Sequence, residues 1–235
     1  MSIKVQHLSK VYAEQIALND ISFEIKANRI VGFLGPNGAG KSTTMKLLAG
    51  LLKPSKGNCF INGIDVQEKP LLVKKDLGYL PENNPLYMDM YVREMLTFEA
   101  NSHKLKNKVA RINEIIQLTG LVPEQHKKIQ QLSKGYRQRV GIALCMLHNP
   151  SVLILDEPTT GLDPNQILEI RSLIKELGKE KTVLISTHIM QEVEAICDDV
   201  IILDKGQIKE NCPLSELKIK YPNQSLEQIF VKLTK

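Results

Sequence analysis

Residues 35–43, with the sequence Gly-Pro-Asn-Gly-Ala-Gly-Lys-Ser-Thr, constrain this chain more than any other stretch. They follow an apolar run over 30–34 and precede a helix-like run over 44–49, which is the strand, glycine-rich turn and helix that a phosphate-binding loop requires. Glycines let the backbone curl so that amide N–H groups converge on an anion, and the helix N-terminus adds unpaired donors. The loop therefore predicts a nucleoside triphosphate site, in which Lys41 reaches the β- and γ-phosphates and Ser42 binds Mg²⁺. The predicted phosphate-binding residues are Gly35, Pro36, Asn37, Gly38, Ala39, Gly40, Lys41, Ser42 and Thr43.

Composition limits the classes of protein to which the chain can belong. Its 235 residues are 43% hydrophobic with a net charge of +5, which is typical of one large globular domain, with or without an inserted lobe. We expect no membrane span, since the longest apolar runs, such as 142–147, are too short, and no signal peptide, since residues 1–6 lack an apolar core. Four scattered cysteines favour reduced thiols in a cytosolic protein. The absence of tryptophan and the few aromatic residues argue against a nucleic-acid stacking platform.

Apolar patterns divide the chain into an α/β core and a helical insertion. Continuous apolar runs favour parallel strands covered by helices on both faces, whereas residues 88–149 are charged with helical periodicity. Strands are predicted at 3–6, 21–25, 30–34, 58–61, 77–80, 152–155, 182–185 and 200–203. Helices are predicted at 41–52, 165–178, 188–196 and, in a short tail, near 226–233.

Three polar side chains follow predicted core strands. Asp156 and Glu157 come directly after 152–155, and His188 comes shortly after 182–185. Ligands of parallel sheets bind beyond the carboxyl ends of the strands, so these side chains should face the phosphate loop. We predict that Asp156 holds Mg²⁺, that Glu157 polarises the attacking water as general base, and that His188 contacts the γ-phosphate. Taken singly, an Asp-Glu turn or a lone histidine is often only a surface or packed group, so these roles depend on the order of motifs.

A second candidate anion site lies at residues 132–136, Leu-Ser-Lys-Gly-Tyr, before the helical run at 140–147. Ser133 is a good N-cap, and a helix start with a free hydroxyl and a glycine backbone offers donors to an anion. An ordinary capped surface helix has the same pattern, so that alternative stays open for this segment alone.

Together the motifs resemble the ATP-binding subunit of an ABC transporter, over about residues 3–235. Their order is the phosphate loop, Gly-Tyr-Leu-Pro-Glu at 78–82, Leu-Ser-Lys-Gly-Tyr at 132–136, Asp156-Glu157, Gly-Leu-Asp at 161–163 and His188. The resemblance implies an α/β fold: a P-loop NTPase core with a mostly parallel sheet, an N-terminal antiparallel β subdomain and an inserted α-helical subdomain. Within one domain it places the core with its β subdomain at 1–81 and 150–205, the helical subdomain at 82–149 and a short tail at 206–235.

The resemblance also implies a shared nucleotide site. Tyr12 would stack on adenine, and Asp163 would touch the opposite subunit. Ser133 and Gly135 would cap the γ-phosphate of ATP held by the partner's loop, so each site needs two chains. The expected partners are a second nucleotide-binding subunit, identical or similar, and an integral membrane permease, with no nucleic acid. We expect the chain in the cytoplasm, peripheral on the inner face of the membrane, with ATP and Mg²⁺ as its cofactors.

Departures from the family pattern point to a subfamily. Lys134 and Tyr136 stand where glycine and glutamine are commonest, and Glu82 stands where glutamine is usual. Glu82 can still face Mg²⁺ and the attacking water, and so counts as a catalytic and metal-site candidate, but an ionised carboxylate donates no hydrogen bond. Slower hydrolysis or tighter metal dependence is expected. These features resemble the ATPases of ABC-2-type exporters, and residues 78–94 are similar to subunits associated with bacterial gliding motility.

Two other functions remain as alternatives. A soluble ABC protein acting on ribosomes or nucleic acid would usually carry two motif sets, or long coiled-coil or zinc insertions, and this chain has neither. A regulatory module with little turnover is favoured by Glu82. The permease is expected to dock on the helical lobe near residues 83–102, whereas the sequence gives no sign of the transported substrate.

Overall fold

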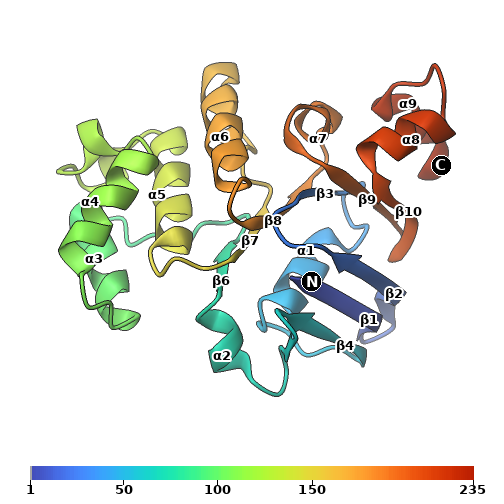
Figure 1. Cartoon of the computed structure of the whole chain (residues 1–235), viewed down its shortest axis with the longest axis horizontal. Coiled ribbons are helices and arrows are strands. Elements are labelled where there is room, and N and C mark those ends of the chain that lie inside the picture. The colour runs from blue at the N-terminus through green and yellow to red at the C-terminus, as the bar shows by residue number, and fades with distance from the viewer. Residues whose placement is uncertain (1) are drawn as a thin grey trace.

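A six-stranded sheet forms the centre of the computed structural model, which describes residues 2–235 (Figure 1). The strand order is β10-β9-β3-β8-β7-β6, in which β10 is antiparallel to β9 and the other neighbours are parallel. Its strands are β3 (Ile30–Leu34), β6 (Leu77–Leu80), β7 (Val152–Asp156), β8 (Thr182–Thr187), β9 (Asp199–Asp204) and β10 (Gln207–Pro213).

A second, antiparallel sheet is built from the N-terminal part of the chain, with the order β2-β1-β4-β5. Its strands are β1 (Ile3–Tyr12), β2 (Gln15–Ile25), β4 (Lys56–Ile61) and β5 (Ile64–Asp65). Helix α1 (Lys41–Leu48) contributes Met45, Leu47 and Leu48 to the core shared by the two sheets. This position fixes the N-terminus of α1 beside the carboxyl end of β3.

The remaining helices flank the sheets or form a separate lobe, whose members are drawn in green to yellow in Figure 1. The lobe contains α3 (Val92–Ser102), α4 (Lys108–Leu118) and α5 (Lys134–Met146), with the 3₁₀ helices η1 (Val122–Glu124) and η2 (Ile129–Gln131). The others are α2 (Pro70–Lys74), α6 (Pro164–Leu177), α7 (Met190–Ile196), α8 (Leu214–Lys220) and α9 (Leu226–Leu233).

The central strands bury both of their faces, as continuous apolar runs predict. Along β7, Val152 and Ile154 pack into the core shared with α1 and the antiparallel sheet. Leu153 and Leu155 point the opposite way, into the core shared with α3, α4, α5 and α6. Successive side chains of a strand alternate between faces, so a run that is apolar at every position requires cover on both sides. The expected α/β fold with a mostly parallel sheet is confirmed.

The tail differs most from the sequence prediction. Only a helix near 226–233 was expected there, yet residues 207–213 form β10 and residues 214–220 form α8. Lys205 and Gly206 both have positive φ (48° and 73°), and they form the tight turn that folds β10 back on β9. The polar sequence of β10 lacks the apolar run on which the other strands were predicted. Helix α1 also ends at Leu48, four residues before the predicted end, because Gly50 turns the chain with φ of 67°.

Within residues 2–235, no helix has the length and apolar character needed to cross a membrane.

Candidate nucleotide site

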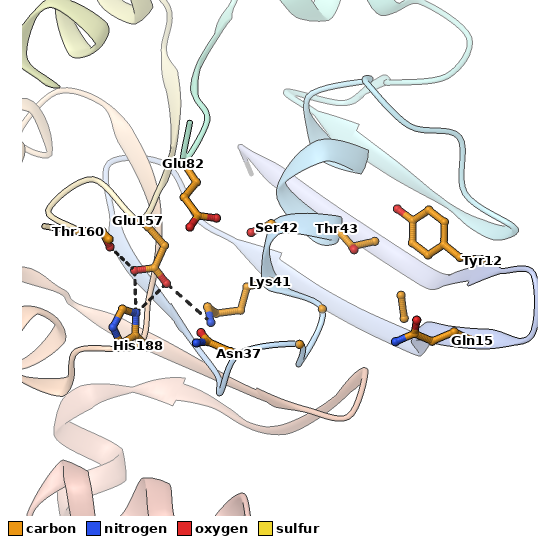
Figure 2. Close-up of a pocket in the computed structure, with 13 residues that line it drawn as sticks. Tyr12, Gln15, Asn37, Lys41, Ser42, Thr43, Glu82, Glu157, Thr160 and His188 are labelled. Carbon is orange, nitrogen blue, oxygen red and sulfur yellow. Dashed lines mark hydrogen bonds and ion pairs between the residues drawn. The ribbon is translucent and has the colours of Figure 1, made fainter. Parts of the chain in front are cut away.

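A pocket of about 570 Å³ lies at the carboxyl ends of the central strands, between the loop after β3 and the β1–β2 hairpin (Figure 2). The residues around it come from segments far apart in the sequence, as a site at the edge of a parallel sheet requires. They are Tyr12, Gln15, Ala17, Asn37, Gly38, Gly40, Lys41, Ser42, Thr43, Glu82, Glu157, Thr160 and His188.

The glycines of the loop are needed for its shape. Gly38 and Gly40 have φ of 80° and 109°, a left-handed conformation that residues with a side chain rarely adopt. At Gly40 a Cβ atom would also lie 2.6 Å from the carbonyl oxygen of Ala17. The loop can therefore lead directly into α1, which begins at Lys41 and turns its first N–H groups toward the pocket.

Lys41 is buried at the centre of the predicted phosphate site. Its side chain is only 7% exposed; its ammonium donates to the carbonyl oxygen of Gly35 at 2.7 Å and lies 3.8 Å from Glu157 Oε1. Burial lowers the pKa of Lys41, while the carboxylates of Glu157, Asp156 and Glu82 raise it. The ammonium of Lys41 is thus enclosed by the loop, where it and the backbone N–H groups can donate hydrogen bonds to phosphate oxygens.

The hydroxyl of Ser42 meets the carboxylate of Asp156, as the sequence predicts for a metal site. Ser42 Oγ donates to Asp156 Oδ1 at 3.2 Å, and Ser186 donates to the same oxygen. Asp156 is 1% exposed. A hydroxyl and a carboxylate are hard oxygen ligands, and Mg²⁺ in nucleotide sites usually takes only one or two protein carboxylates, completing its shell with phosphates and water. This donor set fits Mg²⁺, and within residues 2–235 no group of three or more His, Cys, Asp and Glu side chains is arranged to hold a metal ion.

Glu157 and His188 are in direct contact. His188 Nδ1 lies 2.9 Å from Glu157 Oε2, and Thr160 Oγ1 donates to the same oxygen at 3.0 Å. Glu157 is 8% exposed and has φ of 51°, an unusual backbone conformation that is held by hydrogen bonds from its N–H to Ser186 Oγ and Ser186 O, both at 3.1 Å. Such strain persists only where the surroundings impose it, and it concentrates at functional sites. A carboxylate held against a histidine can accept a proton from water.

Tyr12 and Glu82 lie at different parts of the pocket. Tyr12 ends β1 and is 42% exposed, and Figure 2 shows it far from His188, where a base could stack on the ring. Glu82 follows β6 and lies on the side of the pocket that contains Ser42. Its carboxylate is therefore close enough to the phosphate loop to affect the charge there.

Ser133, Gly135 and Asp163 do not border this pocket. Ser133 is exposed and caps α5 by accepting from the N–H of Tyr136 at 3.3 Å. Gly135 packs against Gln166 of α6, and Asp163 caps α6 by accepting from the N–H of Gln166 at 3.0 Å. The predicted second anion site is thus remote from the chain's own phosphate loop.

Sequence reasoning missed four residues of the site. Gln15 and Ala17 line the pocket from β2, and Thr160 and Ser186 hold Glu157. Gln15 is the cross-strand partner of Tyr12, so a hairpin prediction for this segment would have found it. Thr160 and Ser186 carry no signal of their own, because their role comes from the turn of the loop after β7 and from the position of β8 beside Glu157.

Comparison with known proteins agrees with this geometry. A family model described as "ABC transporter" matches residues 18–160. The chain belongs to the ABC transporter family. It is an ATP-binding subunit of that family and an ATPase.

Relatives and solved structures extend the match over nearly the whole chain. The bacitracin transport ATP-binding protein BcrA of Bacillus licheniformis is 39% identical over 218 residues, which cover 92% of this chain and 71% of BcrA. The solved ATP-binding subunit of an ABC transporter is 32% identical with a TM-score of 0.90, and each chain is covered completely. The dimeric post-hydrolysis structure of the cassette MJ0796 with ADP and Pi is 25% identical with a TM-score of 0.82, covering 90% of this chain and 98% of MJ0796.

Proposed function

We propose that this ABC subunit binds MgATP between two nucleotide-binding chains, hydrolyses it, and drives transport through a separate membrane permease of the ABC-2 exporter type. The observation that carries the proposal is that the motifs of one chain do not all meet at one pocket. Lys41, Glu157 and His188 surround one pocket, whereas Ser133 is exposed outside it. A second chain placing its own Ser133 over that pocket would complete the site, and the dimeric MJ0796 structure supports such an assembly.

The proposed chemistry assigns one task to each group. Lys41 and the loop N–H groups bind the β- and γ-phosphates, and Tyr12 stacks on the base. Ser42 and Asp156 would hold Mg²⁺, with Glu82 facing it, and the ion would neutralise charge that develops on the phosphates. Glu157 accepts the proton of the attacking water, and His188 orients that carboxylate and contacts the γ-phosphate. Asp163, at the start of α6, would contact the second chain.

A groove on the helical lobe is the proposed docking surface for the permease. It has a volume of roughly 410 Å³ and lies where β6 meets α3 and α5. Tyr87 and Phe98 line it as an exposed edge-to-face pair, with ring centroids 5.9 Å apart. Pro81 and Asn84 line the groove, and Glu82 between them lines the nucleotide pocket. An apolar segment of the permease that binds in this groove, at the cytoplasmic face of the membrane, would therefore contact the segment that carries Glu82.

Phe98→Glu should abolish co-purification with the neighbouring multi-span permease, because it replaces an aromatic side chain that lines the groove with a charged one. The steady-state ATPase rate of the isolated subunit should remain close to wild type, since Phe98 does not line the nucleotide pocket. Ile219→Glu is the matched control, as Ile219 is 80% exposed on α8, outside the groove. Retention of the permease by Phe98→Glu would exclude this docking surface, and failure of the wild-type chain to bind any membrane protein would contradict the transport proposal.

Glu82 favours a second function, a regulatory module with low turnover, because it adds negative charge near the phosphates. Glu82→Gln removes that charge and restores an amide donor, so we expect ATPase activity to be preserved or raised. The exposed Glu227→Gln on α9 controls for the loss of one negative charge. A collapse of Glu82→Gln to background hydrolysis would show instead that the carboxylate is needed. A wild-type subunit without measurable steady-state ATPase would favour the regulatory function.

A further inference from the structure

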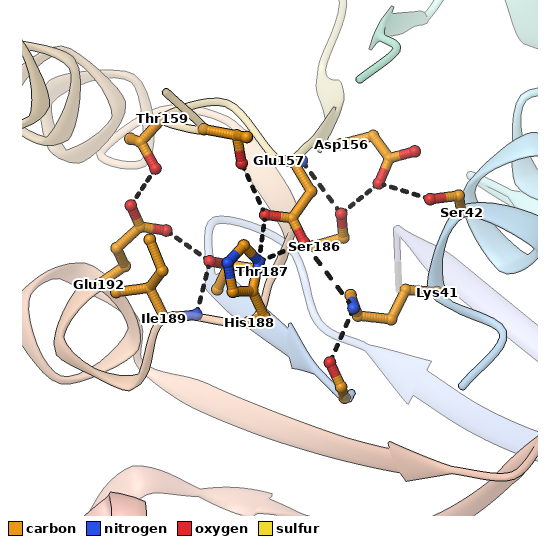
Figure 3. A network of polar contacts seen from close by, with 12 residues as sticks. Lys41, Ser42, Asp156, Glu157, Thr159, Ser186, Thr187, His188, Ile189 and Glu192 are labelled. Carbon is orange, nitrogen blue, oxygen red and sulfur yellow. Dashed lines mark hydrogen bonds and ion pairs between the residues drawn. The ribbon is translucent and has the colours of Figure 1, made fainter. Parts of the chain in front are cut away.

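Glu192 is a buried carboxylate that none of the roles above uses. It lies on α7, four residues after His188, and is 2% exposed. Thr187 Oγ1 donates to its Oε2 at 2.7 Å, and Thr159 Oγ1 donates to its Oε1. Figure 3 shows the carboxylate between the two threonines, on the far side of Glu157 and His188 from Lys41. Both oxygens are thus engaged by hydroxyl groups.

These threonines belong to the two segments that carry the proposed catalytic pair. Thr159 lies two residues after Glu157, and Thr187 immediately precedes His188. Thr187 Oγ1 also accepts from the N–H of Ile189 at 3.1 Å, which fixes the backbone on the other side of His188. Glu192 therefore connects the loop that follows β7 to the last residue of β8.

This connection lies beyond the last residue pair between β7 and β8. Strands β7 and β8 pair in parallel as far as Asp156 and Ser186. Past that point, Glu157 takes its left-handed conformation and accepts the bond from His188 Nδ1. The Glu192 carboxylate holds the two segments together where they carry reactive side chains, and its own helix follows directly from the second of them.

A purely stabilising role explains the arrangement poorly. The nearest cation, Arg171 Nη2 on α6, lies 4.0 Å from Glu192 Oε1, and Arg171 Nε is buried without a partner in the described chain. Buried ion pairs contribute little net stability compared with apolar residues of similar size, because of the cost of taking the charges out of water. What the carboxylate supplies, and an apolar residue would not, is a pair of acceptors at fixed positions.

We propose that Glu192 is a positioning residue for ATP hydrolysis. Its hydrogen bonds with Thr159 and Thr187 would fix the positions of Glu157 and His188 relative to each other. The inference rests on the proposed roles of Glu157 and His188. Glu192 does not line the nucleotide pocket, so its loss should affect turnover rather than ATP binding. Displacement of a reacting group by about 1 Å can reduce a rate on the order of 10²-fold.

Glu192→Gln tests this proposal, because glutamine keeps the size of the side chain while its amide nitrogen cannot accept from a threonine. In steady-state ATPase assays of the full chain, we expect kcat to fall roughly 10- to 100-fold, with KM and ATP affinity within about twofold of wild type. Glu194→Gln is the matched control, since Glu194 is an exposed glutamate on the same helix. A wild-type kcat for Glu192→Gln, or an equal loss of ATP affinity and kcat, would overturn the proposal.

Thr159 gives a second test that does not require Glu192→Gln to fold. Thr159→Val removes the hydroxyl at nearly constant size and should lower kcat, whereas Thr159→Ser keeps the donor and should stay close to wild type. Since Thr159 is proposed to act only through its contact with Glu192, the double variant Thr159→Val/Glu192→Gln should be no slower than the slower single variant. Equal activity of the valine and serine variants would contradict the inference.

Glu157→Gln, measured alongside, separates the two claims. If it abolishes turnover while Glu192→Gln and Thr159→Val hydrolyse ATP normally, only the positioning role fails. If Glu157→Gln itself hydrolyses ATP at the wild-type rate, the proposed role of Glu157 fails first.

Discussion

Glu157→Gln should reduce ATP hydrolysis by about 10²- to 10⁴-fold, the range typical of a lost general base, while ATP binding is retained. The carboxylate contacts His188 and lies 3.8 Å from Lys41, so it sits between His188 and the phosphate loop, within reach of a water next to the γ-phosphate. Glutamine fills the same space but does not accept a proton at neutral pH. Steady-state phosphate release gives kcat, and a fluorescent-nucleotide titration gives the affinity.

The exposed Glu180→Gln, in the turn after α6, is the control for this charge change. It should hydrolyse ATP at the wild-type rate. Near-normal hydrolysis by Glu157→Gln would remove Glu157 from the reaction, and a loss of nucleotide binding by that variant would mean that the carboxylate maintains the pocket instead.

Lys41→Ala should weaken ATP binding by about 10- to 150-fold, which corresponds to the roughly 1.5–3 kcal/mol of a hydrogen bond to a charged group. The variant removes the cation enclosed by the phosphate loop, and it leaves Glu157 without its neighbouring positive charge. Both changes disfavour a polyanion in the pocket. Equilibrium titration with MgATP measures the effect directly, since hydrolysis is not required.

Lys46→Ala, on the exposed face of the same helix, changes the net charge equally and should bind ATP like the wild type. If Lys41→Ala and Lys46→Ala gave the same titration curve as the wild type, Lys41 would have no part in binding the phosphates.

The features that the sequence predicts well are local. The phosphate loop depends on glycines at 38 and 40, whose positive φ is needed at those two positions, so spacing alone indicates the turn. Apolar runs such as 152–155 predict strands, and the polar residues that follow them predict the edge where ligands bind. Asp156 and Glu157 are predicted to lie at that edge for this reason.

The features that the sequence does not reveal depend on contacts between distant segments. Strand β10 is polar and forms by pairing with β9, so its sequence contains no apolar run from which a strand could be predicted. Ser186 becomes part of the site only because the end of β8 lies beside Glu157, and Thr160 only because the loop after β7 turns back on that residue. Glu192 has the sequence of an ordinary helical glutamate, and its burial between two threonines follows from tertiary packing alone.

The central claim is that one nucleotide is shared by two chains, and the molar mass of Glu157→Gln in solution tests it most directly. Light scattering with saturating MgATP should give twice the monomer mass of 26.5 kDa, because binding continues while hydrolysis no longer separates the chains. The same protein without nucleotide, or with Ser133→Arg added, should have the mass of one chain. A mass of 26.5 kDa for Glu157→Gln at saturating MgATP would contradict the account.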